Sequence, residues 1–200
     1  MQERDIKSYV KRICKKNIQK EYVKRIQGKD IFMSKKEKEV KTNAMRILDK
    51  NKIPYEVVTY TCDEFIDGVH IADQLGQPYE ISFKTLVTLG KSGEHYVFVL
   101  PVDKEVDFKK AAKCAGEKSV EMIHVKDINA VTGYIRGGCT PVGMKKLFPT
   151  FIHESARNFD KIIISGGQLG AQIHLNPEDL AKVVNGKFVD IAADYTHEQI

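Results

Sequence analysis

The chain has 200 residues, of which 42% are hydrophobic and 30% are charged, as is typical of a soluble globular protein with one sizeable core. Its longest apolar runs have the length of strands, too short to cross a bilayer, and no apolar signal segment marks the N-terminus. We therefore expect a cytoplasmic protein that does not associate with a membrane.

Positive charge is concentrated at the start of the chain. The formal net charge is +5, and residues 1–32 hold ten basic and four acidic side chains, so residues 33–200 are nearly neutral at −1. Apolar residues recur at mostly helical spacing over residues 5–27, which predicts one basic amphipathic helix or two that break near Asn17. From Met33 onward the sequence resembles the start of a complete protein. We therefore divide the chain into a basic helical extension, residues 1–32, and one domain, residues 33–200.

The domain combines short helical and strand patterns. Helices are expected at residues 33–53, 70–76, 107–116, 125–133 and 176–186. Strands are expected at residues 55–60, 82–89, 95–100, 150–155, 161–165, 171–175 and 187–191. Strands outnumber helices, and turn signals such as residues 90–94 join several strands as hairpins. The pattern predicts an α+β fold with a mixed, largely antiparallel sheet and surrounding helices; whether the sheet closes into a barrel stays open.

Lys84 is the one charged residue in the strand expected at residues 82–89. Side chains alternate along a strand, so Lys84 shares a face with Leu86 and opposes Thr85. One interpretation is a solvated lysine near a strand end, which the burial statistics of lysine favour. The other is a pocket lysine that holds an anionic or carbonyl oxygen.

Four glycines lie within Gly133–Lys146, together with Pro141 and three basic residues. Glycine is needed where φ is positive or where the backbone approaches another group closely. The segment is therefore either an elaborate turn or a loop that directs its N–H groups at an oxyanion or phosphate. The segment Ser165–Gly170 repeats the theme, and a simple hairpin is favoured there. Cys139 lacks an identifiable histidine base, so we do not expect it to be a nucleophile.

Metal and nucleotide motifs are absent from the sequence. Its four cysteines form no CxxC pair, and its six histidines form no HExxH array. Neither a Walker A segment nor a dinucleotide-binding fingerprint occurs. We expect reduced thiols, no metal site and no cofactor.

Six segments, in this order, resemble the YbaK family of aminoacyl-tRNA deacylases. They cover about residues 40–192 and leave residues 1–32 outside the resemblance. The segments are KIPYEVVTY, FKTLVTL, VLPVDKEVDFKKAAKCAGEKSVEM, TGYIRGGCTPVGMKKLFPTFIHESA, IIISGGQLGAQIHL and DLAKVVNGKFVDIA. Any one alone would be weak, and their shared order makes the match specific.

The resemblance implies a pocket for the aminoacyl end of tRNA, with Lys84 as the family's key pocket lysine. Gly137 and Gly138 correspond to the loop glycines whose N–H groups would polarise the ester carbonyl. Lys84 would anchor the terminal nucleotide. These three residues are the expected catalytic set.

The resemblance also implies substrate contacts by Tyr60, which matches the pocket tyrosine, and by Ser165, which matches the serine of the SGG loop. Thr140 belongs to a pair of loop positions that vary among relatives and is added to this set. Many members carry an aspartate seven residues after that serine, whereas this chain has Gln172. The pocket would then lack a carboxylate for the substrate amine at this position, and the preferred amino acid would change.

The implied function is trans-editing of misacylated tRNA, most characteristically cysteine on tRNA(Pro). Aminoacyl-tRNA is the implied substrate, and prolyl-tRNA synthetase is a candidate partner. In the family's cysteine case the substrate's own thiol attacks its carbonyl, so no protein nucleophile is required. The alternative is a non-catalytic module that binds the tRNA end or a small ligand on the same fold, and Gln172 keeps this alternative open.

Overall fold

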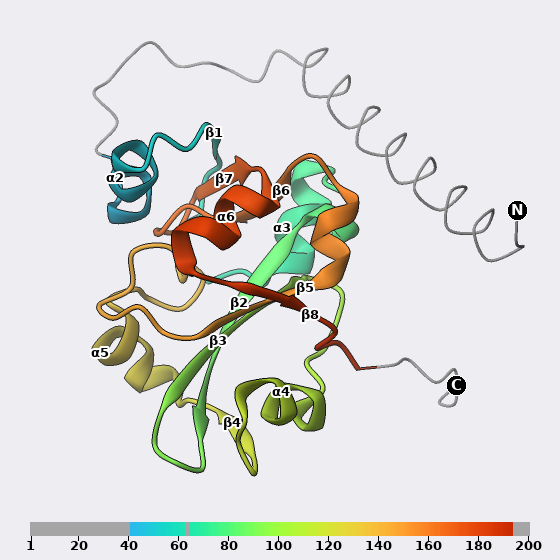
Figure 1. The fold of residues 1–200 in the computed structure, drawn as a ribbon. Coiled ribbons are helices and arrows are strands. Elements are labelled where there is room, and N and C mark those ends of the chain that lie inside the picture. Colours follow the sequence, from blue (N-terminus) through green and yellow to red (C-terminus); the bar gives the residue numbers. More distant parts are fainter. Residues whose placement is uncertain (1–40, 63–64, 194–200) are drawn as a thin grey trace, which may run out of the picture.

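The computed structural model describes residues 41–62 and 65–193 (Figure 1). The basic helix predicted over residues 5–27 and the domain boundary at residue 32 lie outside these residues. Over the described ranges, no helix is both long enough and apolar enough to cross a bilayer.

Eight strands of the described chain form two sheets. The smaller sheet has the order β1 (Tyr55–Thr59), β7 (Ala171–Leu175), β6 (Ile162–Ser165), and both pairs are antiparallel. The larger sheet has the order β4 (Val120–Met122), β2 (Phe83–Gly90), β3 (His95–Pro101), β5 (Thr150–His153), β8 (Lys187–Val189). Its first two pairs are antiparallel and its last two are parallel. The predicted α+β fold with a mixed, largely antiparallel sheet is confirmed.

Helices surround the two sheets (Figure 1). The α-helices are α2 (Asn43–Lys50), α3 (Gly68–Leu75), α4 (Phe108–Ala115), α5 (Ile128–Thr132) and α6 (Pro177–Val184). The 3₁₀ turns are η1 (Tyr79–Ile81), η2 (Val125–Asp127) and η3 (Glu154–Asn158). The helix predicted over residues 125–133 is thus divided between η2 and α5. The strand β4 was not predicted, because three residues carry too little pattern to reveal a strand.

The two sheets meet at a single parallel bridge between Ser82 and Ile163. The strands β4 and β8 are the two edges of the larger sheet. In the part of the chain that the structure describes, the strands therefore form two open sheets and do not close into a barrel.

The strand β3 is buried on both faces, which fixes the larger sheet in the interior. Val97 and Val99 belong to the main core, which also contains residues of the smaller sheet and of α2 and α6. Phe98 and Leu100 point the other way and pack with residues of α4, including Ala111. Nearly continuous apolar sequence is what a strand with two covered faces requires.

The strand β2 leaves part of its outer edge without a strand neighbour. The Val102 N–H donates to the Ser82 carbonyl, which sets the hydrogen-bond phase of β2 and β3. Hydrogen-bonded and non-hydrogen-bonded residues alternate along an antiparallel pair of strands. Thr85, three residues after Ser82, is therefore a non-hydrogen-bonded position, and its backbone N–H and C=O point away from β3. The strand β4 pairs with β2 only at Thr88–Gly90. The backbone of Thr85 therefore faces a space that no described strand fills.

Candidate functional site

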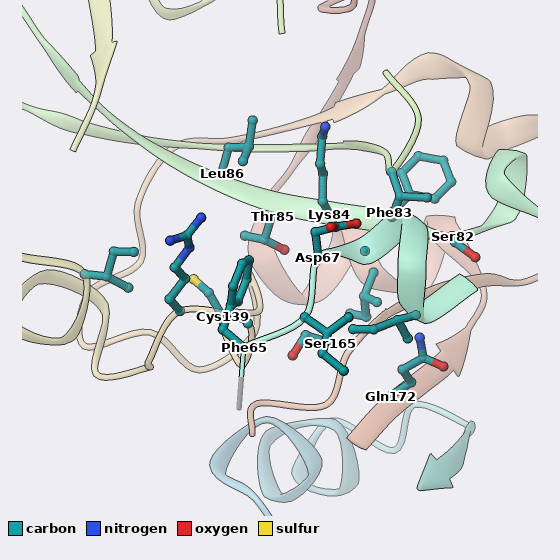
Figure 2. A pocket seen from close by; sticks show the side chains of 18 of the residues that line it. Phe65, Asp67, Ser82, Phe83, Lys84, Thr85, Leu86, Cys139, Ser165 and Gln172 are labelled. Carbon is teal, nitrogen blue, oxygen red and sulfur yellow. The ribbon is translucent and has the colours of Figure 1, made fainter. Parts of the chain in front are cut away.

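A pocket of about 390 Å³ lies beside this open edge of β2 (Figure 2). Its walls come from β2, from β6 and β7, from the glycine loop after α5, and from the segment that leads into α3. Most lining side chains are apolar and a few are polar, which is typical of small-molecule sites. The pocket thus forms where the smaller sheet approaches the uncovered edge of the larger one.

Five of the seven residues that the sequence singled out line this one pocket. They are Tyr60, Lys84, Gly137, Ser165 and Gln172. They come from four separate parts of the chain, and only the fold brings them together. The other two, from the glycine loop, are placed differently.

Gly137 is the glycine of the loop that faces the pocket, and its conformation requires glycine. Its φ is +81°, in the left-handed region that L side chains rarely adopt. A Cβ at this position would lie 2.7 Å from Leu169 Cδ2 and 3.0 Å from Phe65 Cδ2. The missing side chain therefore lets two neighbouring segments close over the loop.

Gly138 joins two loops instead of lining the pocket. A Cβ at Gly138 would lie 3.0 Å from the Gln168 Cα, so its glycine allows close packing against the Ser165–Gly170 loop. The Gly138 N–H donates to the Ile135 carbonyl at 3.0 Å. The N–H that was expected to polarise a substrate carbonyl already has an acceptor within the turn. Thr140 is fully buried and also does not line the pocket.

Lys84 lines the pocket and also forms an ion pair with Glu105. Its ammonium lies 3.1 Å from Glu105 Oε1, and its side chain is 24% exposed against 71% for that of Glu105. Figure 2 shows Lys84 and Leu86 on one side of β2 and Thr85 on the other, as strand alternation requires. An ion pair with an exposed carboxylate contributes little stability, so an anionic ligand can displace Glu105 at small cost.

Thr85 is a pocket residue that received no role from the sequence. Its Oγ1 is buried and has no hydrogen-bond partner among the described residues. Leaving a buried hydroxyl unpaired costs about 1–3 kcal/mol, and a ligand that pairs with it recovers part of that cost. The signal was its place beside Lys84 in the FKT segment, but no sequence pattern reveals an unpaired hydroxyl.

Gln172 is held by Gln77, which follows α3. The Gln77 Nε2 lies 2.6 Å from Gln172 Oε1, and the Gln172 Nε2 lies 3.1 Å from Gln77 Oε1. Both residues are buried, at 4% and 9% exposure for Gln77 and Gln172. The pocket wall at this point is a neutral amide pair, and its second member is 95 residues away in sequence.

Three ionisable side chains of the pocket, those of Cys139, Asp67 and Tyr60, have pKa values shifted further from neutral pH. Burial raises the pKa of the Cys139 thiol to about 12, so it stays protonated and is a poor nucleophile. The Asp67 carboxylate accepts the Val69 and His70 N–H groups as the N-cap of α3, and the bond from His70 is the largest factor lowering its pKa. Burial raises the pKa of Tyr60. No histidine is found among the described lining residues.

Over residues 41–62 and 65–193, no group of three or more His, Cys, Asp or Glu side chains is arranged to hold a metal ion.

Comparison with known proteins identifies the family. Residues 69–183 match the model of the aminoacyl-tRNA editing domain. A protein of Enterococcus faecalis described as a Cys-tRNA(Pro)/Cys-tRNA(Cys) deacylase, EbsC, is 46% identical over 160 residues, which are 80% of this chain and 98% of that protein.

Solved structures share the fold at lower sequence identity. One, described as a trans-editing enzyme for prolyl-tRNA synthetase, has a TM-score of 0.67 and 20% identity over 76% of this chain and 96% of its own. Another, the hypothetical protein APE2540, has a TM-score of 0.70 and 20% identity over 76% of this chain and all of its own. The fold, the order of the matching segments along the chain and the sequence similarity all agree. This chain belongs to the aminoacyl-tRNA editing domain family.

Proposed function

We propose that this chain removes cysteine from misacylated tRNA(Pro) by cleaving the aminoacyl ester. The observation that carries the proposal is the pocket that gathers Tyr60, Lys84, Gly137, Ser165 and Gln172 in a chain of the editing family. The similarity to a protein described as a Cys-tRNA(Pro)/Cys-tRNA(Cys) deacylase supports cysteine as the amino acid. A volume of about 390 Å³ is ample for an aminoacyl group.

The proposed chemistry is substrate-assisted. The substrate thiol attacks the ester carbonyl, a sulfur–carbon bond forms, and the bond from the carbonyl carbon to the ribose oxygen breaks. The thiol proton passes to that oxygen, so the products are a cyclic thiolactone and free tRNA. Such a reaction needs positioning and carbonyl polarisation, and no nucleophile from the protein. The Cys139 thiol stays protonated and is a poor nucleophile, which supports a reaction in which the substrate provides the attacking thiol.

Each pocket residue has a proposed role. Lys84 exchanges Glu105 for a phosphate or ribose oxygen of the terminal nucleotide, as a flexible ammonium can. The Gly137 backbone N–H polarises the carbonyl, and the Thr85 hydroxyl pairs with a polar atom of the substrate. Tyr60, Ser165 and Gln172 shape the space around the amino acid.

Two parts of the proposal concern partners. Prolyl-tRNA synthetase would supply the misacylated tRNA in the cytoplasm. Residues 33–200 are nearly neutral, so they would gain affinity for tRNA from such a tRNA-binding partner. Residues 1–32 carry a net charge of +6 and would add phosphate contacts. Deletion to Met33 should then weaken tRNA binding and flatten its salt dependence, with the rate at saturating tRNA unchanged.

The proposal is tested by incubating the purified full chain with tRNA(Pro) charged with cysteine, alanine or proline, and with Cys-tRNA(Cys). We expect Cys-tRNA(Pro) to be deacylated faster than Ala-tRNA(Pro), since alanine lacks the thiol. Mass spectrometry of the released amino acid separates thiolactone, the cyclisation product, from cysteine released directly by hydrolysis. Tight binding of all four tRNAs without turnover would show that the chain is a non-catalytic binding module and would contradict the proposed enzyme activity.

A further inference from the structure

The rim of the pocket carries an aromatic ring stacked with a guanidinium. Phe65 and Arg136 both line the pocket, although they belong to different segments. The Arg136 Cζ lies 4.0 Å from the centroid of the Phe65 ring. Phe65 is 42% exposed, and Arg136 is exposed as well. The pair is therefore accessible to a ligand that enters the pocket.

Gly137 explains why the ring can occupy this place. Because Gly137 has no side chain, Phe65 Cδ2 comes within 3.0 Å of where its Cβ would lie. The ring thus packs against the loop that presents Arg136. Met122 and Val125, which also line the pocket, are 42% and 56% exposed and extend the apolar rim.

A second arginine–phenylalanine pair shows what is unusual about the rim. Arg157 Cζ lies 4.3 Å from the centroid of the Phe188 ring, and Arg157 Nε also donates to Glu178 Oε1 at 2.9 Å. That guanidinium has a carboxylate partner and does not line the pocket. Within residues 41–62 and 65–193, no carboxylate forms an ion pair with Arg136. The in-plane N–H groups of Arg136 and the exposed surface of its guanidinium are available to a ligand.

A planar cation supported by an aromatic ring suits one class of ligand in particular. Nucleobases stack on aromatic rings and on arginine guanidinium planes, and the N–H groups of the same arginine can reach ribose or phosphate oxygens. An aminoacyl group inside the pocket is bonded to the ribose of the terminal adenosine. The base of that nucleotide must therefore lie near the mouth of the pocket.

We propose that Arg136 and Phe65 form a stacking site for the terminal nucleobase of the tRNA. The proposal rests on the proposed function, because it assumes that a tRNA end enters this pocket. It assigns recognition of the base to the rim, separate from the residues that hold the amino acid and the ester.

The test uses uncharged acceptor-stem minihelices of tRNA(Pro) that end in CCA, with the last nucleotide either intact or abasic. Binding to the full chain is measured by fluorescence anisotropy at fixed salt. We expect the intact end to bind roughly tenfold more tightly, within the range of one base stacked on a side chain. Arg136→Lys keeps the charge but not the plane, and Phe65→Leu keeps apolar bulk but not the ring. Each should lose most of the preference for the intact end.

Arg157→Lys is the matched control, because it alters an arginine–phenylalanine pair outside the pocket. It should keep the wild-type preference. An equal affinity of wild-type protein for the two minihelices would overturn the proposal. So would a fall of equal size for both minihelices in Arg136→Lys, since that is the result for a phosphate contact. Circular dichroism of each variant checks that the fold is retained.

Failure of this inference and failure of the proposed function give different results. Turnover of Cys-tRNA(Pro) without any preference for the intact end supports the deacylase activity and contradicts the proposed stacking site. A preference that depends on Arg136 and Phe65, without turnover of any charged tRNA, supports the stacking site and removes the deacylase.

Discussion

The two ends of β2 carry similar residues in different surroundings. At one end, Thr88–Gly90 pairs with β3 and with β4; at the other, Thr85 pairs with β3 and faces the pocket. Both Thr85 and Thr88 bury a hydroxyl oxygen that lacks a hydrogen-bond partner among the described residues. Of the two residues, Thr85 lines the pocket and Thr88 does not. The same unfavourable burial is thus a fixed cost at the paired end and a potential binding contact at the open end.

Lys84 gives the strongest test of the open end. Lys84→Ala should reduce kcat/KM on Cys-tRNA(Pro) by roughly 100-fold or more, the scale for removing a key electrostatic group. The free energy of unfolding should change by less than about 1 kcal/mol, because the partner Glu105 is exposed. Lys110→Ala is the control: Lys110 is 27% exposed, is paired with Asp190, and does not line the pocket. A rate near that of wild type in Lys84→Ala would remove Lys84 from the site.

Thr85→Val and Thr88→Val compare the two ends directly. Each replaces an unpaired buried hydroxyl with a methyl group of similar size, so neither should lower the free energy of unfolding measured in urea. Thr85→Val should lower kcat/KM about tenfold, the value of one hydrogen bond to the substrate. Thr88→Val should leave the rate unchanged. If the two variants behave alike in the deacylation assay, the Thr85 hydroxyl does not bind substrate.

Gln172→Asp tests the amide pair across the pocket. A carboxylate can pair with the substrate ammonium, and charge-assisted hydrogen bonds are about twice as strong as neutral ones. Both aminoacyl groups carry this ammonium, but drawing it toward residue 172 also moves the thiol that only Cys-tRNA(Pro) must bring to its carbonyl. We therefore expect the ratio of rates on Cys-tRNA(Pro) and Ala-tRNA(Pro) to change by about fivefold, which corresponds to about 1 kcal/mol. The exchange also places a charge beside Gln77 in a buried position, so some stability should be lost. Identical ratios for the two proteins would show that position 172 does not select the amino acid.

Cys139→Ser should have the smallest effect on catalysis. The thiol is protonated at neutral pH, so replacing it should preserve most of the deacylation rate. An aminoacyl group trapped on Cys139 would contradict this expectation.

The raised pKa of Cys139 also has a consequence for stability. Its ordinary value is 9.0 and its value in the fold is about 12, so between these values the folded state holds a proton that the unfolded state has lost. The free energy of unfolding should therefore fall as the pH rises from about 9 toward 12. Urea titrations at pH 8 and pH 10.5 should show a smaller loss in Cys139→Ser, because serine does not titrate in this range.

Sequence patterns located most elements because their signals are local. The helix α6 has Asn176 as its N-cap and Pro177 at its first position, and both signals lie within the segment itself. Its end differs slightly, since Asn185 adopts the left-handed conformation one residue before Gly186. The strand β4 was missed because its residues become a strand only by pairing with Thr88–Gly90, far away in the chain.

The sequence by itself determined the family, the α+β class, and five residues that line one pocket: Tyr60, Lys84, Gly137, Ser165 and Gln172. Residue order and type carry these properties. Tertiary structure alone decided that Gly138 joins two loops, that Gln77 holds Gln172, and that Arg136 stacks on Phe65. Such contacts depend on the phase of strand pairing and on the approach of distant segments. No local periodicity records either.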